Sequence, residues 1–200
     1  MPEILRAGSR PAVPWKNGGG VTREVAVFPA GSGLADFDWR VSVAEVRAAG
    51  AFSRFPGVDR RMAILEGRLA LTVEAQPATM RLAPGSAPVF FPGDVPAFGE
   101  PLDGAVLDLN VMTRRGRFES TVTCHTLTQV LELDPEQGTL LVLALSDVSL
   151  RGAGPEVRLA RLDAARIEAA PGRCAIIPIP APASCYLVRI TACAGAGAGR

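Results

Sequence analysis

Glycine and proline break this chain into short apolar or alternating runs along its whole length. The 200 residues include 21 Gly and 17 Pro, so packed amphipathic helices have little room, whereas strands of roughly four to eight residues fit between the turns. The pattern is typical of an all-β sandwich or barrel. Residues 163–169 are predicted as a single helical turn. Strands are predicted at residues 21–28, 37–46, 61–65, 69–73, 87–91, 105–112, 121–127, 140–145, 157–162, 174–177 and 185–191.

The composition indicates a globular chain without a broad electrostatic surface. Hydrophobic residues make up 48% of the chain and the mean hydropathy is +0.23, which suffices for a core and excludes disorder of the whole chain. The formal charge is only +1, and the chain lacks the like-charge runs typical of nucleic-acid or anionic-membrane binding. It also lacks a signal-peptide pattern and any apolar run near the roughly 18 residues of a membrane span. We therefore expect a cytoplasmic protein with a small-molecule partner, and neither nucleic acid nor a membrane.

Two segments of the chain repeat the same order of turns and apolar runs. Residues 82–85 end in Pro-Gly and precede apolar runs at 89–92 and 105–111, and residues 169–172 likewise precede runs at 175–178 and 186–191. This spacing predicts a duplicated double-stranded β-helix of the jelly-roll type, although Pro-Gly turns precede strands in other β proteins too. The predicted domains are residues 1–120, residues 121–192 packed as one globular unit, and a loose Gly/Ala tail at 193–200.

Side chains that bind transition metals are scarce. His125 is the single histidine, and the four cysteines at positions 124, 174, 185 and 193 lack C-x-x-C spacing. We therefore expect no metal site, no cofactor and free thiols. A catalytic triad built on His125 stays open, but no G-x-S-x-G elbow accompanies it, and an ordinary histidine on a strand is favoured.

Lysine and asparagine are rare enough to mark a candidate site. Lysine occurs only as Lys16, and asparagine only as Asn17 and Asn110, whereas arginine is abundant. A bias that replaces both residue types wherever Arg or Asp suffices would leave them where an ammonium or an amide is needed. Lys16 and Asn17 precede the run Gly18-Gly19-Gly20, whose backbone can approach a ligand closely. Asn-Gly is also ordinary turn chemistry, so a structural role remains the alternative.

Charged residues interrupt the predicted strands around this segment. Arg23 falls on an apolar strand face, where an unpaired charge is costly, so it must pair with an acidic side chain or bind an anion. The cluster Arg114-Arg115-Gly116-Arg117 is predicted to be a solvated turn. A pocket lining is predicted from three further pairs of residues: Arg40 and Ser42, Asp59 and Arg60, and Asp108 and Asn110.

Three longer motifs extend these observations: Pro14-Trp15-Lys16-Asn17-Gly18-Gly19-Gly20-x-Thr22-Arg23-Glu24; Phe52-Ser53-x-Phe55-Pro56-Gly57-x-Asp59-Arg60 followed by Leu65-Glu66-Gly67; and Asp108-x-Asn110-Val111-Met112. On these motifs the chain resembles the HutD/Ves family of small bacterial bicupins. The resemblance implies a double-cupin fold without the metal-binding histidines of other cupins. It also implies a modulator of histidine utilisation that senses urocanate or N-formylglutamate, and it brings no established catalytic activity.

Three functional hypotheses follow. The first is a regulatory protein whose cupin pocket binds a small carboxylate through arginine side chains. The second is a metal-independent enzyme of the isomerase or amidohydrolase type, with Lys16 or Glu24 in proton transfer. The third is a structural protein that pairs through exposed strand edges, for example as a homodimer. The candidate ligand-binding residues are Trp15, Lys16, Asn17, Gly19, Thr22, Arg23, Arg40, Asp59, Arg60, Asp108 and Asn110.

Overall fold

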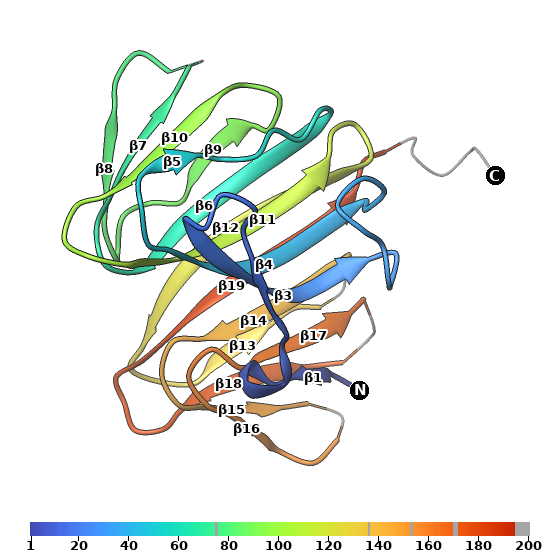
Figure 1. Cartoon of the computed structure of the whole chain (residues 1–200). Helices are drawn as coiled ribbons and strands as arrows, with labels where there is room; N and C mark the ends of the chain where they lie inside the picture. The colour runs from blue at the N-terminus through green and yellow to red at the C-terminus, as the bar shows by residue number, and fades with distance from the viewer. Residues whose placement is uncertain (75, 136, 153, 170–171, 195–200) are drawn as a thin grey trace. The chain divides into compact units, whose positions relative to one another are not determined.

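The structure, a computed structural model, describes residues 1–74, 76–135, 137–152, 154–169 and 172–194. The chain forms two compact units. The N-terminal unit is Arg10–Phe118, and the C-terminal unit combines Met1–Ser9 with Glu119–Arg200. Strands dominate both units, and helical structure within the described residues is limited to the short 3-10 helix η1 (Ala7–Ser9) (Figure 1). This confirms the predicted all-β class.

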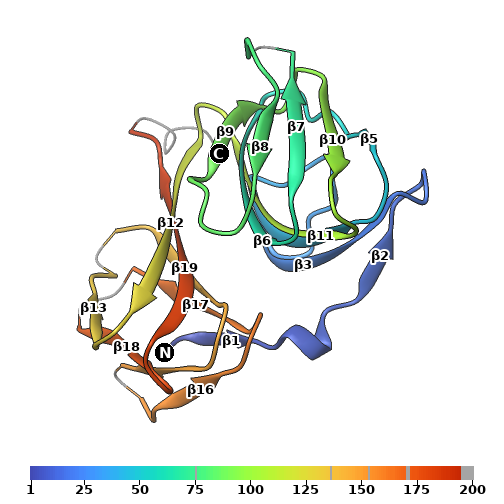
Figure 2. The same ribbon diagram turned by 90° about the vertical axis from the view of Figure 1, so that its left-hand side faces the viewer.

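The N-terminal unit consists of two antiparallel sheets. Its strands are β2 (Ala12–Pro14), β3 (Gly20–Phe28), β4 (Trp39–Val46), β5 (Gly50–Ala51), β6 (Val58–Glu66), β7 (Leu69–Val73), β8 (Met80–Leu82), β9 (Val89–Pro92), β10 (Ala97–Pro101) and β11 (Val106–Arg114). The larger sheet has the order β2-β3-β4-β11-β6-β9, and the smaller has the order β5-β10-β7-β8. Figure 2 shows the two sheets curving around a shared interior.

Apolar side chains from both sheets fill part of that interior. Met62 and Ile64 of the larger sheet pack with Leu69 and Leu71 of the smaller one, and all four are almost completely buried. Successive side chains of a strand point to opposite faces of its sheet, so alternate residues of β6 reach this core. The same alternation brings polar residues of β4, β6 and β11 to the inner face, where they form the site described below.

The C-terminal unit also consists of two antiparallel sheets. Its strands are β1 (Glu3–Leu5), β12 (Phe118–Leu127), β13 (Leu131–Leu133), β14 (Thr139–Ala144), β15 (Val148–Arg151), β16 (Val157–Leu159), β17 (Ala164–Glu168), β18 (Cys174–Pro178) and β19 (Ala183–Ala192). The strand orders are β1-β17-β14-β19-β12 and β13-β18-β15-β16. Leu140, Val142, Leu159 and Ile176 lie in its separate core.

The two units repeat one topology. Strand β11 lies between β4 and β6, as β19 lies between β12 and β14, and β10 lies between β5 and β7, as β18 lies between β13 and β15. The eight strands from β4 to β11 therefore correspond in order to those from β12 to β19. This is the expected duplicated jelly roll, to which β2 and β3 add in one unit and β1 adds in the other.

The alignment of the two repeats that was predicted from the sequence is partly wrong. The Pro-Gly turn at 82–85 leads into β9, whereas the segment 169–172 precedes β18 in the sequence, and β18 corresponds to β10. Residues 170–171 lie outside the described part of the chain. Pro-Gly turns suit more than one strand connection in a jelly roll, so they could not fix the alignment. The later match, of 105–111 with 186–191, joins the equivalent strands β11 and β19.

Two further expectations, which concern strands β1 and β17, differ from the structure. The predicted first domain began at residue 1, but β1 pairs with β17, so Met1–Ser9 belongs to the C-terminal unit. The predicted helical turn at 163–169 is instead strand β17, because pairing with β1 and β14 overrides its weak local preference. Most of the predicted loose tail, residues 195–200, lies outside the described residues.

Short edge strands such as β2, β5, β8 and β13 were also not predicted, because two or three residues carry no periodic pattern. All four cysteines are free; Cys174 and Cys185 are buried. No helix in the described part of the chain is long and apolar enough to cross a bilayer.

Candidate functional site

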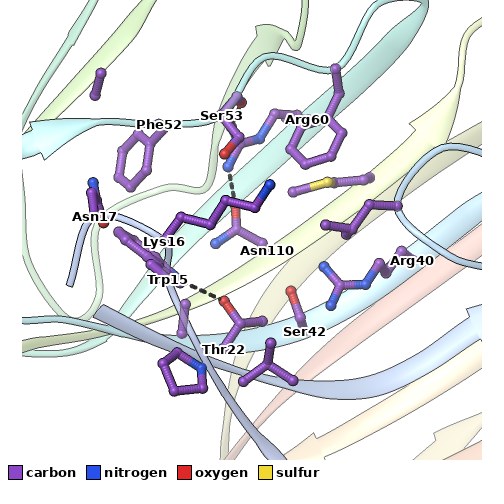
Figure 3. Close-up of a pocket in the computed structure, with 17 residues that line it drawn as sticks. Trp15, Lys16, Asn17, Thr22, Arg40, Ser42, Phe52, Ser53, Arg60 and Asn110 are labelled. Carbon is purple, nitrogen blue, oxygen red and sulfur yellow. Dashed lines mark hydrogen bonds between the residues drawn. The ribbon is translucent and has the colours of Figure 1, made fainter. Parts of the chain in front are cut away.

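A cavity of about 490 Å³ opens in the N-terminal unit. The β2–β3 hairpin, the inner faces of β4, β6 and β11, and the segment after β5 surround it (Figure 3). Its lining combines aromatic side chains with cations, hydroxyls and amides. The lining residues are Val13, Pro14, Trp15, Lys16, Asn17, Thr22, Leu34, Arg40, Ser42, Ala44, Ala51, Phe52, Ser53, Phe55, Arg60, Asn110 and Met112.

Trp15 forms an aromatic wall of the cavity. Its indole Nε1 donates a hydrogen bond of 2.8 Å to Thr22 Oγ1, and its ring meets Phe52 edge-on, with centroids 6.0 Å apart. Gly20 makes this placement possible, because a Cβ there would lie 2.5 Å from the Glu45 carbonyl oxygen and 3.1 Å from the indole ring. The glycine run thus lets the tryptophan pack against the backbone of the hairpin.

The other hairpin residues divide between the turn and the cavity. Asn17 Oδ1 accepts a hydrogen bond of 3.0 Å from the Gly19 N–H, which stabilises the turn, while Asn17 also lines the cavity. Gly19 does not line it; its carbonyl oxygen accepts the Arg47 N–H at 2.8 Å. Gly18 has a φ of +71°, which favours glycine. Figure 3 shows the Lys16 side chain pointing into the cavity.

Strand register places polar side chains in a row across the floor. Ser42 of β4 lies opposite Asn110 of β11, and Arg40 lies opposite Met112. Arg60 of β6 also lies opposite Met112, on its other side. Because opposite residues in adjacent strands project from the same face, these side chains converge from three neighbouring strands. Each was already a candidate from sequence, except Met112, which appeared only within a motif.

Arg60 is the most enclosed cation of the site, with 4% of its surface exposed. Its guanidinium carbon lies 4.9 Å from the centroid of the Phe91 ring, 5.5 Å from that of Phe52 and 5.9 Å from that of Phe55. Arg60 Nη2 donates a 2.7 Å hydrogen bond to Asn110 Oδ1. Burial lowers the pKa of Arg60 to about 10, against the opposing effect of Asp108, so the side chain stays protonated near neutral pH.

Asp108 lies behind this row and does not line the cavity. It is fully buried, and its Oδ1 accepts a hydrogen bond from Asn110 Nδ2. Burial raises the pKa of Asp108 to about 7, while Arg60 and the Asn110 hydrogen bond act in the opposite direction. Asn110 therefore links the buried Asp108 carboxyl group to the buried Arg60 guanidinium.

The cavity carries an excess of positive charge. Lys16, Arg40 and Arg60 line it, and none of its lining residues is Asp or Glu. Arg40 is paired with a carboxylate outside the lining, Glu24, whose Oε2 accepts a 2.8 Å hydrogen bond from Arg40 Nε. Three cations beside apolar rings favour an anionic ligand with an apolar or planar body.

Seven of the eleven predicted residues lie together in this lining: Trp15, Lys16, Asn17, Thr22, Arg40, Arg60 and Asn110. Gly19 and Asp108 lie next to it and support it, as described. Arg23 and Asp59 do not belong to it. Arg23 follows the cavity-lining Thr22 and so projects from the opposite face of β3. Asp59 instead accepts a 2.8 Å hydrogen bond from Arg115 Nε.

The sequence reasoning did not single out the aromatic and hydroxyl residues of the segment after β5. Phe52, Ser53 and Phe55 line the cavity, and Phe52 contacts both Trp15 and Arg60. These residues were part of the second motif. Their polar and aromatic mixture in a loop was the signal that could have identified them, since such loops often carry function.

The basic cluster at the end of β11, residues 114–117, has a structural role. Arg114 donates to the carbonyl oxygens of Pro56 and Phe37, at 3.2 and 3.0 Å. Arg115 bridges Asp59 and Asp94, at 2.7 and 2.6 Å, and Arg117 bonds to Asp38. The predicted solvated turn is confirmed, since residues 115–117 form an exposed turn, and the arginine side chains also bind neighbouring loops.

The cavity does not offer the donors that metal-dependent cupins need. Its polar lining consists of cations, amides and hydroxyls, which suit an anion better than a divalent cation. Among the described residues, no group of three His, Cys, Asp or Glu side chains could hold an ion. His125 lies on β12 in the C-terminal unit, 2.9 Å from the Thr123 hydroxyl.

Two jelly-roll units of the same topology, one of them enclosing a cavity, define a bicupin. Comparison with solved structures agrees: an oxalate decarboxylase from Bacillus subtilis superposes with a TM-score of 0.64 over 94% of this chain and 76% of that one. Sequence identity is only 9%, so this likeness concerns the fold alone.

The chain belongs to the HutD family, whose model matches residues 7–178. An uncharacterized 21.2 kDa protein in the hutC 3′ region of Pseudomonas putida is 36% identical over 83% of this chain and 86% of its own. Protein Ves from Citrobacter koseri is 38% identical over 54% of this chain and 56% of its own.

Two solved structures extend this family likeness over nearly the whole chain. A conserved protein of unknown function from Pseudomonas aeruginosa has a TM-score of 0.86 and 30% identity, covering 96% of this chain and 99% of that one. HutD from Pseudomonas fluorescens has a TM-score of 0.81 and 26% identity, covering 97% and 100%. The family is linked to histidine utilisation, as the resemblance implied.

Proposed function

We propose that this protein binds a small carboxylate intermediate of histidine degradation, urocanate or N-formylglutamate, and thereby modulates histidine utilisation. The observation that carries the proposal is the cavity lined by Lys16, Arg40 and Arg60 without a carboxylate among its lining residues. The family link to histidine utilisation supports the choice of compounds. The cavity volume, about 490 Å³, suits molecules of this size.

The two arginines offer different kinds of contact to an anion. Arg60 is wedged among aromatic rings and held by Asn110, so its guanidinium is fixed before a ligand arrives. Arg40 is held by Glu24 on one edge, where its Nε donates, which leaves the other edge for a ligand. Pre-oriented cations bind a carboxylate with little loss of side-chain entropy.

The enzyme hypothesis has weaker support from this geometry. Of its two proton-transfer candidates, Lys16 lines the cavity, whereas Glu24 does not line it and bonds to Arg40. Asp108 is buried behind Asn110 and does not reach the cavity surface. A general base must lie within hydrogen-bond reach of the proton it removes, so neither carboxylate is placed for that role.

Calorimetric titration of both compounds tests the proposal. We expect Arg40→Ala and Arg60→Met to weaken binding by roughly ten- to a hundredfold, because each loses a charge-assisted hydrogen bond. Methionine keeps the apolar contacts of Arg60 with the surrounding rings. Arg23→Ala is the matched control, since this arginine projects from the other face of the sheet and should leave affinity unchanged.

The possible results separate the hypotheses clearly. Absence of binding by either compound to the wild-type protein, or equal affinity in all folded variants, contradicts the proposal. Conversion of either compound to a product during the titration, detected by chromatography, supports the enzyme hypothesis instead.

A further inference from the structure

A row of three polar side chains runs inward from the cavity. Arg60 and Asn110 line the cavity, and Asp108 lies behind Asn110 in the interior. Asn110 Oδ1 accepts from Arg60 Nη2 at 2.7 Å, and Asn110 Nδ2 donates to Asp108 Oδ1. The amide thereby connects the cavity to a carboxyl group that no cavity ligand can touch.

Asp108 has few groups with which to share a negative charge. Its neighbours across the sheet are Ala44 of β4 and Ile64 of β6, and Asn110 follows it on the same face of β11. Arg60 is the charged group that acts on it. Asp108 Oδ2 and Arg60 Nε, both buried, have no hydrogen-bond partner among the described residues. An ionised carboxylate with one unsatisfied oxygen is costly in such surroundings.

The charged groups on the cavity side are all tied to the proposed ligand site. Lys16 and Arg40 line the cavity together with Arg60, and Glu24 bonds to Arg40. Without a ligand, Asp108 in its ionised form is thus the buried counter-charge of Arg60. An anion arriving at Arg60 would bring a second negative charge to the same guanidinium.

We propose that an anionic ligand replaces Asp108 as the counter-charge of Arg60, so that ligand binding is coupled to uptake of one proton by Asp108. The inference rests on the proposed function of the cavity. The proton comes from solvent and forms an O–H bond at Asp108 Oδ2, the oxygen without a partner. Oδ1 keeps its hydrogen bond from Asn110, so Arg60 stays in place. Asp108 is a positioning residue that acts through Asn110 and Arg60.

This coupling has a definite direction. Protonation of Asp108 removes the charge that competes with the ligand, so low pH favours binding and high pH opposes it. Burial already raises the pKa of Asp108 to about 7 in the protein without ligand. The change in affinity therefore falls in a pH range that calorimetry can cover. N-formylglutamate is the better probe, since its carboxylates remain ionised near neutral pH, whereas the imidazole ring of urocanate can itself take up a proton.

Calorimetry of N-formylglutamate in buffers of different ionisation enthalpy measures this proton uptake directly. For the wild-type protein we expect uptake to rise from near zero at about pH 6 toward one proton at about pH 8, with roughly tenfold weaker affinity at the higher pH. Asp108→Asn should bind with almost no proton uptake and no pH dependence over this range. Asp163→Asn is the matched control, because Asp163 is also buried and paired with an arginine, but lies in the C-terminal unit.

The outcomes distinguish this inference from the proposed function. Wild-type binding without proton uptake, or equal uptake in the Asp108→Asn variant, would overturn the coupling and leave the carboxylate site standing. Uptake that disappears in Asp163→Asn would also overturn it. Absence of binding to the wild-type protein at both pH values would overturn the proposed function, and the coupling with it.

Discussion

Arg60 owes its orientation to aromatic rings and an amide rather than to a direct ion pair. Three phenylalanine rings surround the guanidinium, and Asn110 separates it from Asp108. A direct carboxylate contact would neutralise the charge and block the edge that a ligand needs. The amide therefore transmits the stabilising field of Asp108 while leaving Arg60 available to an anion.

The free energy of unfolding should depend on pH because of the buried Asp108 carboxyl group at the same site. Folding raises the pKa of Asp108 from 3.8 to about 7, so in this window the folded state holds a proton that the unfolded chain has released. Stability is thus highest below the unfolded pKa and falls as pH rises through the folded one. Each pH unit in this window should lower the free energy of unfolding by about 1.4 kcal/mol relative to Asp108→Asn.

Urea unfolding of the wild-type protein and the Asp108→Asn variant between about pH 4 and pH 8 checks this prediction. The free energy of unfolding of the wild-type protein, taken relative to that of Asp108→Asn, should fall as pH rises and then level off above about pH 7. A difference that is constant with pH would show that Asp108 titrates normally in the folded state.

Among the elements, the β2–β3 hairpin does the most to shape the cavity. It supplies Trp15, Lys16 and Asn17 from one turn, and the backbone pairing of Trp15 with Gly20 closes that turn, with N···O 2.9 Å. The indole then bonds to Thr22 on the following strand. A single hairpin thus provides an aromatic wall, a cation and an amide.

Gly20→Ala should damage this hairpin selectively. The added methyl group would meet the Glu45 carbonyl oxygen at 2.5 Å and the Trp15 ring at 3.1 Å. We expect a loss of about 1–3 kcal/mol in the free energy of unfolding, together with weaker ligand binding. Gly8→Ala is the control, since a Cβ there meets nothing within 4 Å.

Tryptophan fluorescence is the natural measurement, because Trp15 and Trp39, the two tryptophans of the chain, both lie in the N-terminal unit. Wild-type stability and an unchanged emission spectrum in Gly20→Ala would contradict the packing described for Trp15.

At the scale of the whole molecule, Met1–Ser9 form part of the C-terminal unit and stabilise it. Strand β1 pairs with β17, Arg6 Nη1 bonds to Asp163 Oδ2 at 2.7 Å, and the Ala7 N–H bonds to Asp163 Oδ1 at 2.8 Å. Burial raises the pKa of Asp163, but Ala7, Arg6 and the Ala160 N–H together hold it below its ordinary value. The stability that Asp163 contributes is therefore present at neutral pH and lost as pH falls through this lowered pKa.

Removal of residues 1–9 should destabilise the C-terminal unit. A buried carboxylate that loses two of its partners costs on the order of 2 kcal/mol, and the edge of β17 loses its neighbouring strand. Urea unfolding followed by circular dichroism measures the change. Arg158→Ala, which breaks an exposed pair with Asp147, should have almost no effect. Ligand affinity of the truncated protein should match the wild type, because the cavity lies within the N-terminal unit.

The sequence by itself determined the all-β class and most of the longer strands, because Gly, Pro and period-two alternation are local properties. It also marked Lys16, Asn17 and Asn110 by their rarity, and Arg40 and Arg60 by their interruption of apolar runs. The duplication was visible too, although its register was not.

Tertiary structure decided which face of each strand became the interior. Alternation shows that Asp59 and Arg60 point in opposite directions, but only packing between the two sheets shows that Arg60 points inward and Asp59 outward. Arg23 was misplaced for the same reason. The loop residues Phe52 and Phe55 and the pairing of β1 with β17 join segments far apart in the chain, so no local pattern could specify them. Long-range contacts of this kind depend on which surfaces pack best together, and a single sequence records that choice only indirectly.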